Sequence, residues 1–151
     1  MKKVIFICTG NICRSPMAEH YMQKLVNDNN KQEEYLIDSC GIYAEIGQSA
    51  TVNAKEAIRK YGVDMEAHRG KSIYDVDLNM FDLIICLTSS HKATLLGKYP
   101  NLRDRIYTLK EYVYQDTQYK DIDDPWGYNL NVYESCAEEI VDCVDKIKKK
   151  F

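Results

Sequence analysis

The sequence predicts an α/β protein whose parallel sheet is covered by helices on both faces. Short apolar runs alternate along the chain with segments in which apolar residues recur at helical spacing, and this alternation is typical of strands joined by crossover helices. The strongest runs, VIFIC and FDLIICLT, are apolar along most of their length rather than at every second residue, as expected for strands buried on both faces. No repeat, low-complexity tract or linker divides the 151 residues, so we expect one domain over residues 1–151.

The first half of the chain predicts two strands and two helices. Residues 4–8 form the first strand, and Pro16 then stands where the first turn of a helix tolerates proline. Apolar residues share one face of this helix until NDNN ends it. YLIDSCG (35–41) predicts the second strand, and NAKEAIRKYG (53–62) predicts a helix that Gly62 ends.

The second half repeats the alternation. FDLIICLT (81–88) predicts the third strand, a helix follows over about residues 90–97, and RIYTL (105–109) predicts a short fourth strand. After a polar loop, apolar residues at helical spacing predict a last helix over residues 132–150. In such sheets the binding crevice lies outside the carboxyl ends of the strands.

Composition excludes several classes of function. A net charge of −3 at pH 7 gives no reason to expect nucleic acid or an anionic membrane surface as a partner. No stretch approaches the length of a membrane span, and MKKVIFIC is too short for a signal peptide, so we expect a cytoplasmic monomer with its six cysteines reduced. There is no CxxC pair and the three histidines stand far apart in the sequence, so we expect neither a metal site nor a cofactor.

The string CTGNICRS, residues 8–15, stands at the junction between the first strand and the first helix. A loop that leads into a helix N-terminus directs backbone N–H groups at an anion, and the helix dipole favours negative charge there. Gly10 permits backbone angles that a side chain would forbid, and Arg14 offers a planar fork that binds two phosphate oxygens. The segment therefore predicts a phosphate-binding loop.

The same positive environment favours a thiolate at Cys8, which then lies beneath a bound phosphoryl group for in-line attack. Asn11 can brace the loop, and Ser15 can donate a hydrogen bond to the Cys8 sulfur. The competing interpretation of Cys8 is a buried, inert thiol, but that interpretation explains none of the polar residues that follow. Cys-x5-Arg alone is a weak pattern, whereas the full string between a strand and a helix is a specific one.

At this point the chain resembles the low-molecular-weight protein tyrosine phosphatase family. The match covers nearly the whole chain and is carried by CTGNICRSPMAE, DSCG, AHRGKS, FDLIICLT and DDPWG. The resemblance implies a three-layer α/β/α fold with a central four-stranded parallel sheet, and hydrolysis of phosphomonoesters through a phosphocysteine, without metal. It implies that Cys8 is the nucleophile, that Arg14 clamps the phosphate, and that the amides of residues 9–14 line the phosphate-binding loop Thr9, Gly10, Asn11, Ile12, Cys13, Arg14 and Ser15. Phosphate and vanadate would bind there.

The resemblance also suggests the remaining roles. Asp124, directly before Pro125, is expected to be the general acid and then the general base, with Asp123 as the alternative. His68 is expected to support Asn11 from behind the loop, or else to be a simple structural histidine. Cys13 is expected either to pair with Cys8 in a protective disulfide or to pack. His20 and His91 are expected on the surface, and Cys40, Cys136 and Cys143 in the core.

Substrate choice depends on the walls of the pocket, for which we expect Ile12, Tyr43, Trp126 and Tyr128. GIYAEIGQSATVNAKEAI, DRIYTLKEYV and DPWG resemble the protein-arginine phosphatase branch of the family, but that branch typically has threonine at the position of Ile12. An isoleucine suits an aromatic ring and crowds a guanidinium, so we expect phosphotyrosine in a protein as the substrate and phosphoarginine as the alternative.

Two other classes are weaker candidates. Thioredoxin-coupled arsenate reductases share the loop but need two further cysteines on a mobile segment, whereas Cys86 lies within a predicted strand and the next cysteine is Cys136. A catalytically silent phosphate-binding module would not require Cys8, Arg14 and Asp124 together.

Overall fold

The computed structural model describes residues 1–115 and 118–148. Its sheet has four strands in the order β2-β1-β3-β4, and every neighbouring pair is parallel. The strands are β1 (Lys2–Cys8), β2 (Tyr35–Gly41), β3 (Leu83–Cys86) and β4 (Ile106–Thr108). All four expected strands are present, although the third and fourth are shorter than the apolar runs that predicted them. The parallel α/β prediction is confirmed.

Five α-helices and three 3-10 helices lie between or after the strands within the described residues. The α-helices are α1 (Arg14–Asp28), α2 (Val52–Arg59), α3 (Ser89–Lys98), α4 (Leu109–Tyr114) and α5 (Leu130–Lys148). The 3-10 helices are η1 (Ile73–Asp75), η2 (Leu78–Met80) and η3 (Pro100–Arg105). The last helix begins two residues earlier than expected, and the expected end of that helix at residues 149–150 lies outside the described residues.

Helix α4 was missed, because we expected a polar loop after the fourth strand. The sequence does contain its start signal: the Thr108 side chain accepts from the backbone N–H of Glu111, and the Glu111 side chain accepts in return from the N–H of Thr108. This reciprocal pair is a capping box, which satisfies two N–H groups that a helix start otherwise leaves without partners.

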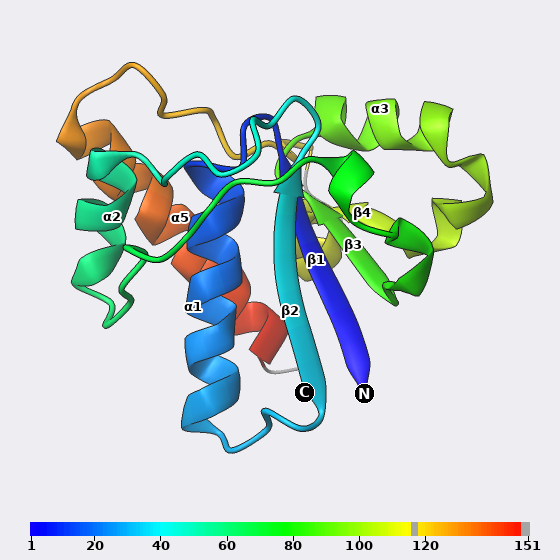
Figure 1. Cartoon of the computed structure of the whole chain (residues 1–151), viewed down its shortest axis with the longest axis horizontal. Coiled ribbons are helices and arrows are strands. Elements are labelled where there is room, and N and C mark those ends of the chain that lie inside the picture. The colour runs from blue at the N-terminus through cyan, green and yellow to red at the C-terminus, as the bar shows by residue number, and fades with distance from the viewer. Residues whose placement is uncertain (116–117, 149–151) are drawn as a thin grey trace.

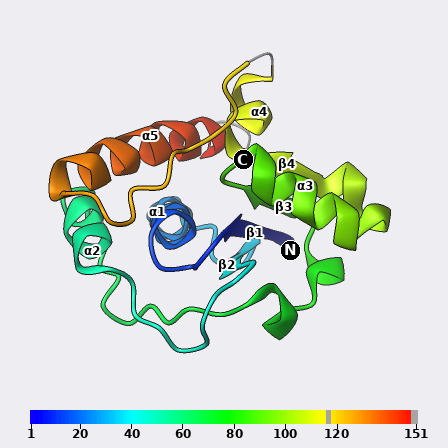
Figure 2. The ribbon, with the colours of Figure 1, turned by 90° about the horizontal axis from the view of Figure 1, so that it is seen from above.

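Two clusters of buried residues form the core, one on each face of the sheet, and Figure 1 shows helices on either side of the strands. Successive residues of β1 point to opposite faces, so Val4 and Phe6 pack in one cluster with α1, α2 and α5, whereas Ile5 and Ile7 pack in another with α3 and η1. Figure 2 shows α1, α2 and α5 together on one side, with α3 beside β3 and β4. Within the described residues, no helix combines the length and the apolar character needed to cross a bilayer.

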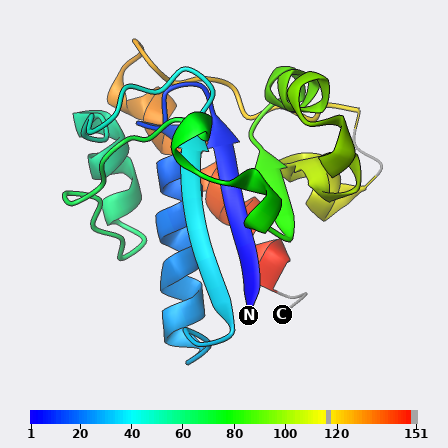
Figure 3. The same ribbon diagram turned by 45° about the vertical axis from the view of Figure 1, so that its right-hand side comes forward.

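The topology determines where a site can form. From β1 the chain passes to β2 on one side and later to β3 on the other, so the strand order reverses at β1. Ligands bind at such reversal points, outside the carboxyl ends of the strands. Figure 3 shows β1 and β2 pointing to the same end of the sheet, where the loops that follow them meet.

Candidate active site

The loop between β1 and α1 has a backbone shape that depends on an asparagine and on a neighbouring glycine. Asn11 has φ 56°, a left-handed conformation that asparagine tolerates better than most residues. Gly41, at the end of β2, lies directly against the loop, and a Cβ there would stand 2.5 Å from the carbonyl oxygen of Thr9. The loop therefore packs against β2 more closely than any residue with a side chain would permit.

Four carbonyl groups of the loop point away from its centre. They accept hydrogen bonds from the surrounding chain: Cys8 from Ile42 N–H, Thr9 from Tyr43 N–H, Asn11 from His68 Nε2–H, and Ile12 from Thr51 N–H. Because the two polar groups of a peptide unit point in opposite directions, this arrangement turns loop N–H groups inward. Helix α1 then begins at Arg14 with no side-chain cap and no acidic residue in its first turn, which leaves its positive end to an anion.

The Cys8 sulfur receives two hydrogen bonds inside this loop. The backbone N–H of Asn11 donates to it at 3.3 Å, and its distance to Ser15 Oγ is 2.9 Å. Asn11 Nδ2 donates to Ser15 Oγ at 2.9 Å. This bond uses one lone pair of the hydroxyl and leaves its proton free, so Ser15 is the donor when Cys8 is a thiolate, which has no proton. Both bonds stabilise a negative charge on Cys8.

The Asn11 side chain is fully buried and uses all its polar atoms. Besides its bond to Ser15, Nδ2 donates to Ser39 Oγ at 2.8 Å, and Oδ1 accepts from the backbone N–H of Lys71 at 3.1 Å. One side chain thus ties the loop to α1, to β2 and to the segment after His68.

Arg14 and Asp124 face Cys8 from the opposite side. Arg14 is 4% exposed, its Nη1 donates to the carbonyl of Ile122 at 2.9 Å, and its Nη2 lies 3.6 Å from Asp124 Oδ2. The other carboxylate oxygen of Asp124 accepts from the N–H of Trp126 at 3.1 Å. The neighbouring Asp123 does not line the pocket with Cys8, and its carboxylate accepts a hydrogen bond from the Tyr119 hydroxyl.

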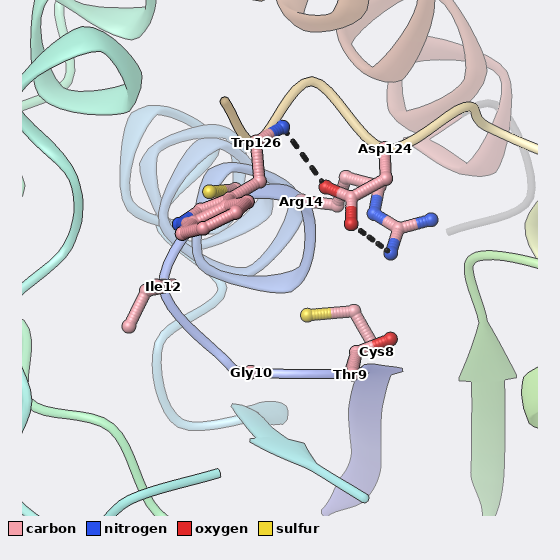
Figure 4. A pocket seen from close by; sticks show the side chains of 8 residues that line it. Cys8, Thr9, Gly10, Ile12, Arg14, Asp124 and Trp126 are labelled. Carbon is pink, nitrogen blue, oxygen red and sulfur yellow. Dashed lines mark hydrogen bonds and ion pairs between the residues drawn. The ribbon is translucent and has the colours of Figure 1, made fainter. Parts of the chain in front are cut away.

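These groups line a pocket of about 250 Å³, formed by Cys8, Thr9, Gly10, Ile12, Cys13, Arg14, Asp124 and Trp126. In Figure 4 the Cys8 side chain lies on one side of the space, Arg14 and Asp124 lie across from it, and Ile12 and Trp126 lie on the left of the view.

Tyr43 and Tyr128, which we expected as further walls, do not line the pocket. Tyr43 is 78% exposed and Tyr128 is 65% exposed. Tyr43 contributes its backbone N–H to the carbonyl of Thr9 and leaves its ring in solvent, and Gly127, with φ 85°, turns the chain between Trp126 and Tyr128.

His91 corrects the expectation of a surface histidine, because it is buried. Its Nε2 lies 2.9 Å from Thr9 Oγ1, and its Nδ1 has no hydrogen-bond partner among the described residues. Burial, assisted by the positive charge of Arg14, lowers the pKa of His91 to about 4, so the ring is neutral at neutral pH. The sequence signal was available in the Thr88 N-cap of α3, which places position 91 in the first turn, near the carboxyl ends of the strands.

His68 lies behind the loop, where its Nε2 donates to the Asn11 carbonyl at 2.8 Å. His20, also expected on the surface, is half-buried, and its Nε2 lies 2.9 Å from His68 Nδ1. Glu19 completes this group: its Oε1 accepts from Ser39 Oγ and stands 3.8 Å from His20 Nε2. Sequence spacing could not reveal the pair, because His20 and His68 are 48 positions apart.

The remaining thiols are buried. Cys40, Cys136 and Cys143 pack in the core as expected, Cys86 is buried within β3, and burial raises the pKa of all four. Burial also raises the pKa of Cys13, whose sulfur lies 3.5 Å from the Tyr133 hydroxyl. Cys8 therefore stands apart from the other five cysteines in having N–H and O–H donors together with Arg14 around it.

A loop of inward N–H groups, a cysteine sulfur, a guanidinium and a carboxyl group form an arrangement suited to transfer of a phosphoryl group. Comparison with known proteins agrees with this class of chemistry. The family model "Low molecular weight phosphotyrosine protein phosphatase" matches residues 3–151. The chain therefore belongs to the low molecular weight phosphotyrosine protein phosphatase family, which confirms the resemblance seen in the sequence.

Individual relatives come from two branches. A low molecular weight protein-tyrosine-phosphatase, PtpB of Staphylococcus epidermidis, is 38% identical over 98% of both chains. The crystal structure of a low molecular weight protein tyrosine phosphatase from T. tengcongensis superimposes with a TM-score of 0.91 at 38% identity over 100% of both chains. A solved structure of the YwlE arginine phosphatase, a mutant with a phosphorylated active-site serine, has a TM-score of 0.90 at 28% identity, covering 98% of this chain and 94% of that one.

Proposed function

We propose that the chain is a protein tyrosine phosphatase that hydrolyses phosphotyrosine through a phosphocysteine on Cys8. The observation that carries this proposal is the environment of the Cys8 sulfur. It accepts hydrogen bonds from the Asn11 N–H and the Ser15 hydroxyl on one side of a pocket whose other side holds Arg14 and Asp124.

In the first step the loop N–H groups and the Arg14 guanidinium bind the phosphate oxygens. The Cys8 thiolate attacks phosphorus, a P–S bond forms, and the P–O bond to the tyrosine ring breaks. Asp124 gives its proton to the departing phenolate oxygen. Its half-exposed carboxyl group is anchored by the Trp126 N–H, which directs it at the mouth of the pocket where the leaving group stands.

In the second step water attacks the phosphocysteine. Asp124, now a carboxylate, takes a proton from the water, and the P–S bond breaks to release phosphate. The Ser15 hydroxyl donates to the sulfur as its negative charge returns, which makes the thiolate a better leaving group. The phosphorylated active-site serine of the arginine phosphatase mutant supports a covalent phosphoenzyme in this family.

The choice of phosphotyrosine rests on two side chains at the pocket. Ile12 and Trp126 both line it and offer apolar surface, which suits an aromatic ring and provides no hydrogen-bond acceptor for a guanidinium. Since Tyr43 and Tyr128 do not line the pocket, selectivity falls on Ile12 and Trp126 alone among the four expected walls.

The test is a comparison of kcat/KM on a phosphotyrosine peptide and a phosphoarginine peptide of the same sequence, for wild type and Ile12→Thr. We expect wild type to prefer phosphotyrosine by at least about tenfold, the effect of about 1.4 kcal/mol, and Ile12→Thr to narrow the preference. Cys8→Ser should abolish both activities. A wild-type preference for phosphoarginine would refute the substrate, whereas an active Cys8→Ser would refute the nucleophile.

The domain organisation, the partners and the compartment of the protein can be proposed on similar grounds. We propose that residues 1–151 act as one phosphatase domain, as a monomer, on phosphorylated proteins, with phosphate and vanadate as ligands of the loop and without nucleic acid as a partner. The free thiols fit a reducing compartment, and we therefore propose the cytoplasm. An arsenate reductase is not supported, because Cys86 is fully buried in β3 and cannot serve on a mobile segment.

A further inference from the structure

Three side chains with metal-binding atoms meet behind the phosphate-binding loop, outside the pocket. They are Glu19 and His20 of α1 and His68 of the segment after α2. One ligand atom from each lies within 4.8 Å of the others: His20 Nε2 is 2.9 Å from His68 Nδ1 and 3.8 Å from Glu19 Oε1. The reaction derived above uses none of these three atoms.

Hydrogen bonding determines which ring nitrogens carry protons. His68 Nε2 donates to the Asn11 carbonyl, so the Nδ1 atom of a neutral His68 carries a lone pair. His20 Nε2 must then be the donor to that lone pair. Imidazole binds a metal ion through the nitrogen lone pair of its neutral ring.

We propose that Glu19, His20 and His68 form a binding site for a divalent transition-metal cation of the zinc class. The lone pair of His68 Nδ1 already points into the cluster. The His20 ring, which is partly exposed, changes tautomer: the proton leaves Nε2 for Nδ1 by way of solvent, the Nδ1–H group then donates a hydrogen bond to water, and the Nε2 lone pair turns to the metal. Any proton on the Glu19 carboxyl group leaves to solvent.

Two of the three separations between ligand atoms lie near the value that zinc requires, and the third is within 4.8 Å. Zinc binds imidazole nitrogen at about 2.0–2.1 Å in tetrahedral geometry, which separates two ligand atoms by about 3.3 Å. The observed separations of 2.9 and 3.8 Å lie on either side of this value. Two imidazoles and one carboxylate favour zinc, cobalt or nickel over magnesium or calcium, which prefer oxygen ligands.

Outer contacts already orient the ligands. The Asn11 carbonyl holds the His68 ring by its second nitrogen, and the Ser39 hydroxyl holds the Glu19 carboxylate. Such contacts set the tautomer and direction of metal ligands. An open hollow of about 360 Å³ is lined by His20 but not by Glu19 or His68, so a cation would reach the cluster from the His20 side.

The experiment must separate this site from the Cys8 thiolate, because thiolates also bind zinc. Chelator-treated Cys8→Ser protein is titrated with Zn²⁺ by calorimetry and with Co²⁺ by visible absorption. We expect one equivalent bound, with the d–d bands of tetrahedral cobalt and without sulfur-to-cobalt charge transfer. Adding His20→Gln should weaken zinc binding by at least about tenfold, and adding Glu19→Gln should weaken it as well.

His91→Gln in the same background is the matched control, since it removes the histidine that lies outside the cluster. We expect it to keep zinc affinity. Circular dichroism and thermal unfolding without metal establish that each variant is folded. The proposal is overturned if Cys8→Ser protein binds no zinc, if a folded His20→Gln variant binds as tightly as its parent, or if sulfur-to-cobalt charge transfer appears.

Discussion

Replacing Ser15 by alanine removes a hydroxyl group that can donate to the Cys8 thiolate. Asn11 Nδ2 donates to Ser15 Oγ, and the serine proton stays available to the sulfur 2.9 Å away. This bond is strongest when the sulfur is negatively charged, both before attack on the substrate and as phosphocysteine is hydrolysed. We expect Ser15→Ala to slow the second step most, because there the thiolate must leave.

The size of the effect follows from the charge on the acceptor. A hydrogen bond to a charged group contributes about 1.5–3 kcal/mol, and a change of about 1.4 kcal/mol in an activation free energy is tenfold in rate. Steady-state kcat should therefore fall by about 10- to 100-fold. If hydrolysis of phosphocysteine becomes limiting, the intermediate accumulates and the first turnover is faster than the following ones.

The assay is rapid-mixing measurement of p-nitrophenol released from p-nitrophenyl phosphate. Ser15→Ala should give a burst close to one equivalent of enzyme, followed by the slow steady rate. Ser39→Ala is the matched control, because Ser39 is equally buried and accepts from the same Asn11 amide but donates to Glu19 instead of sulfur. Equal losses of kcat in the two variants would show that the loop as a whole, and not the bond to sulfur, is responsible.

Three further changes test other parts of the structure. Asp124→Asn should lower kcat by about a hundredfold or more with little change in KM, because the leaving oxygen loses its proton donor; a larger loss for Asp123→Asn would move the acid to that residue. The pKa of His91 is lowered from 6.5 to about 4, so its contribution to stability is present above pH 6.5 and is lost as the pH falls toward 4. The free energy of unfolding, measured with urea, should therefore fall between pH 7 and pH 5 by about 2 kcal/mol less in His91→Gln than in wild type. An equal fall in the two proteins would contradict the burial of a neutral ring. Gly41→Ala should destabilise the protein by about 1–3 kcal/mol and lower kcat/KM, because its Cβ meets the loop carbonyl. Gly97 lies within α3, and a Cβ there would have no atom within 4 Å, so Gly97→Ala should instead stabilise the protein by up to about 1 kcal/mol. Thermal unfolding that ranks the two alanine variants the other way would refute the packing argument.

Local patterns in the sequence were sufficient for most of the fold and for the loop. The buried run before Cys8 and the helix after Arg14 are defined by neighbours in sequence, so the strand, the turn and the helix could all be predicted. Helix α4 was missed because its six residues are too short to show a clear period, although its capping box was present in the sequence.

Contacts between distant segments could not be predicted in the same way. His91 was expected on the surface because nothing beside it in the sequence indicates that Thr9 covers it. Tyr43 was expected at the pocket because it is aromatic and near the site, but the direction of its side chain depends on the hydrogen bond that its backbone makes with Thr9. The contact between His20 and His68 could not be predicted either, because it depends on the path by which the chain after α2 comes back to pack against α1.

Trp126 gives the pocket a built-in optical reporter. It is the single tryptophan of the chain, it lines the pocket, and its indole is largely exposed. Its fluorescence therefore arises from one position at the mouth of the site, so a titration with phosphate or vanadate can be followed by emission from the unlabelled protein. Binding events far from the pocket would leave this signal nearly unchanged, which lets occupancy of the loop be measured separately from other ligands.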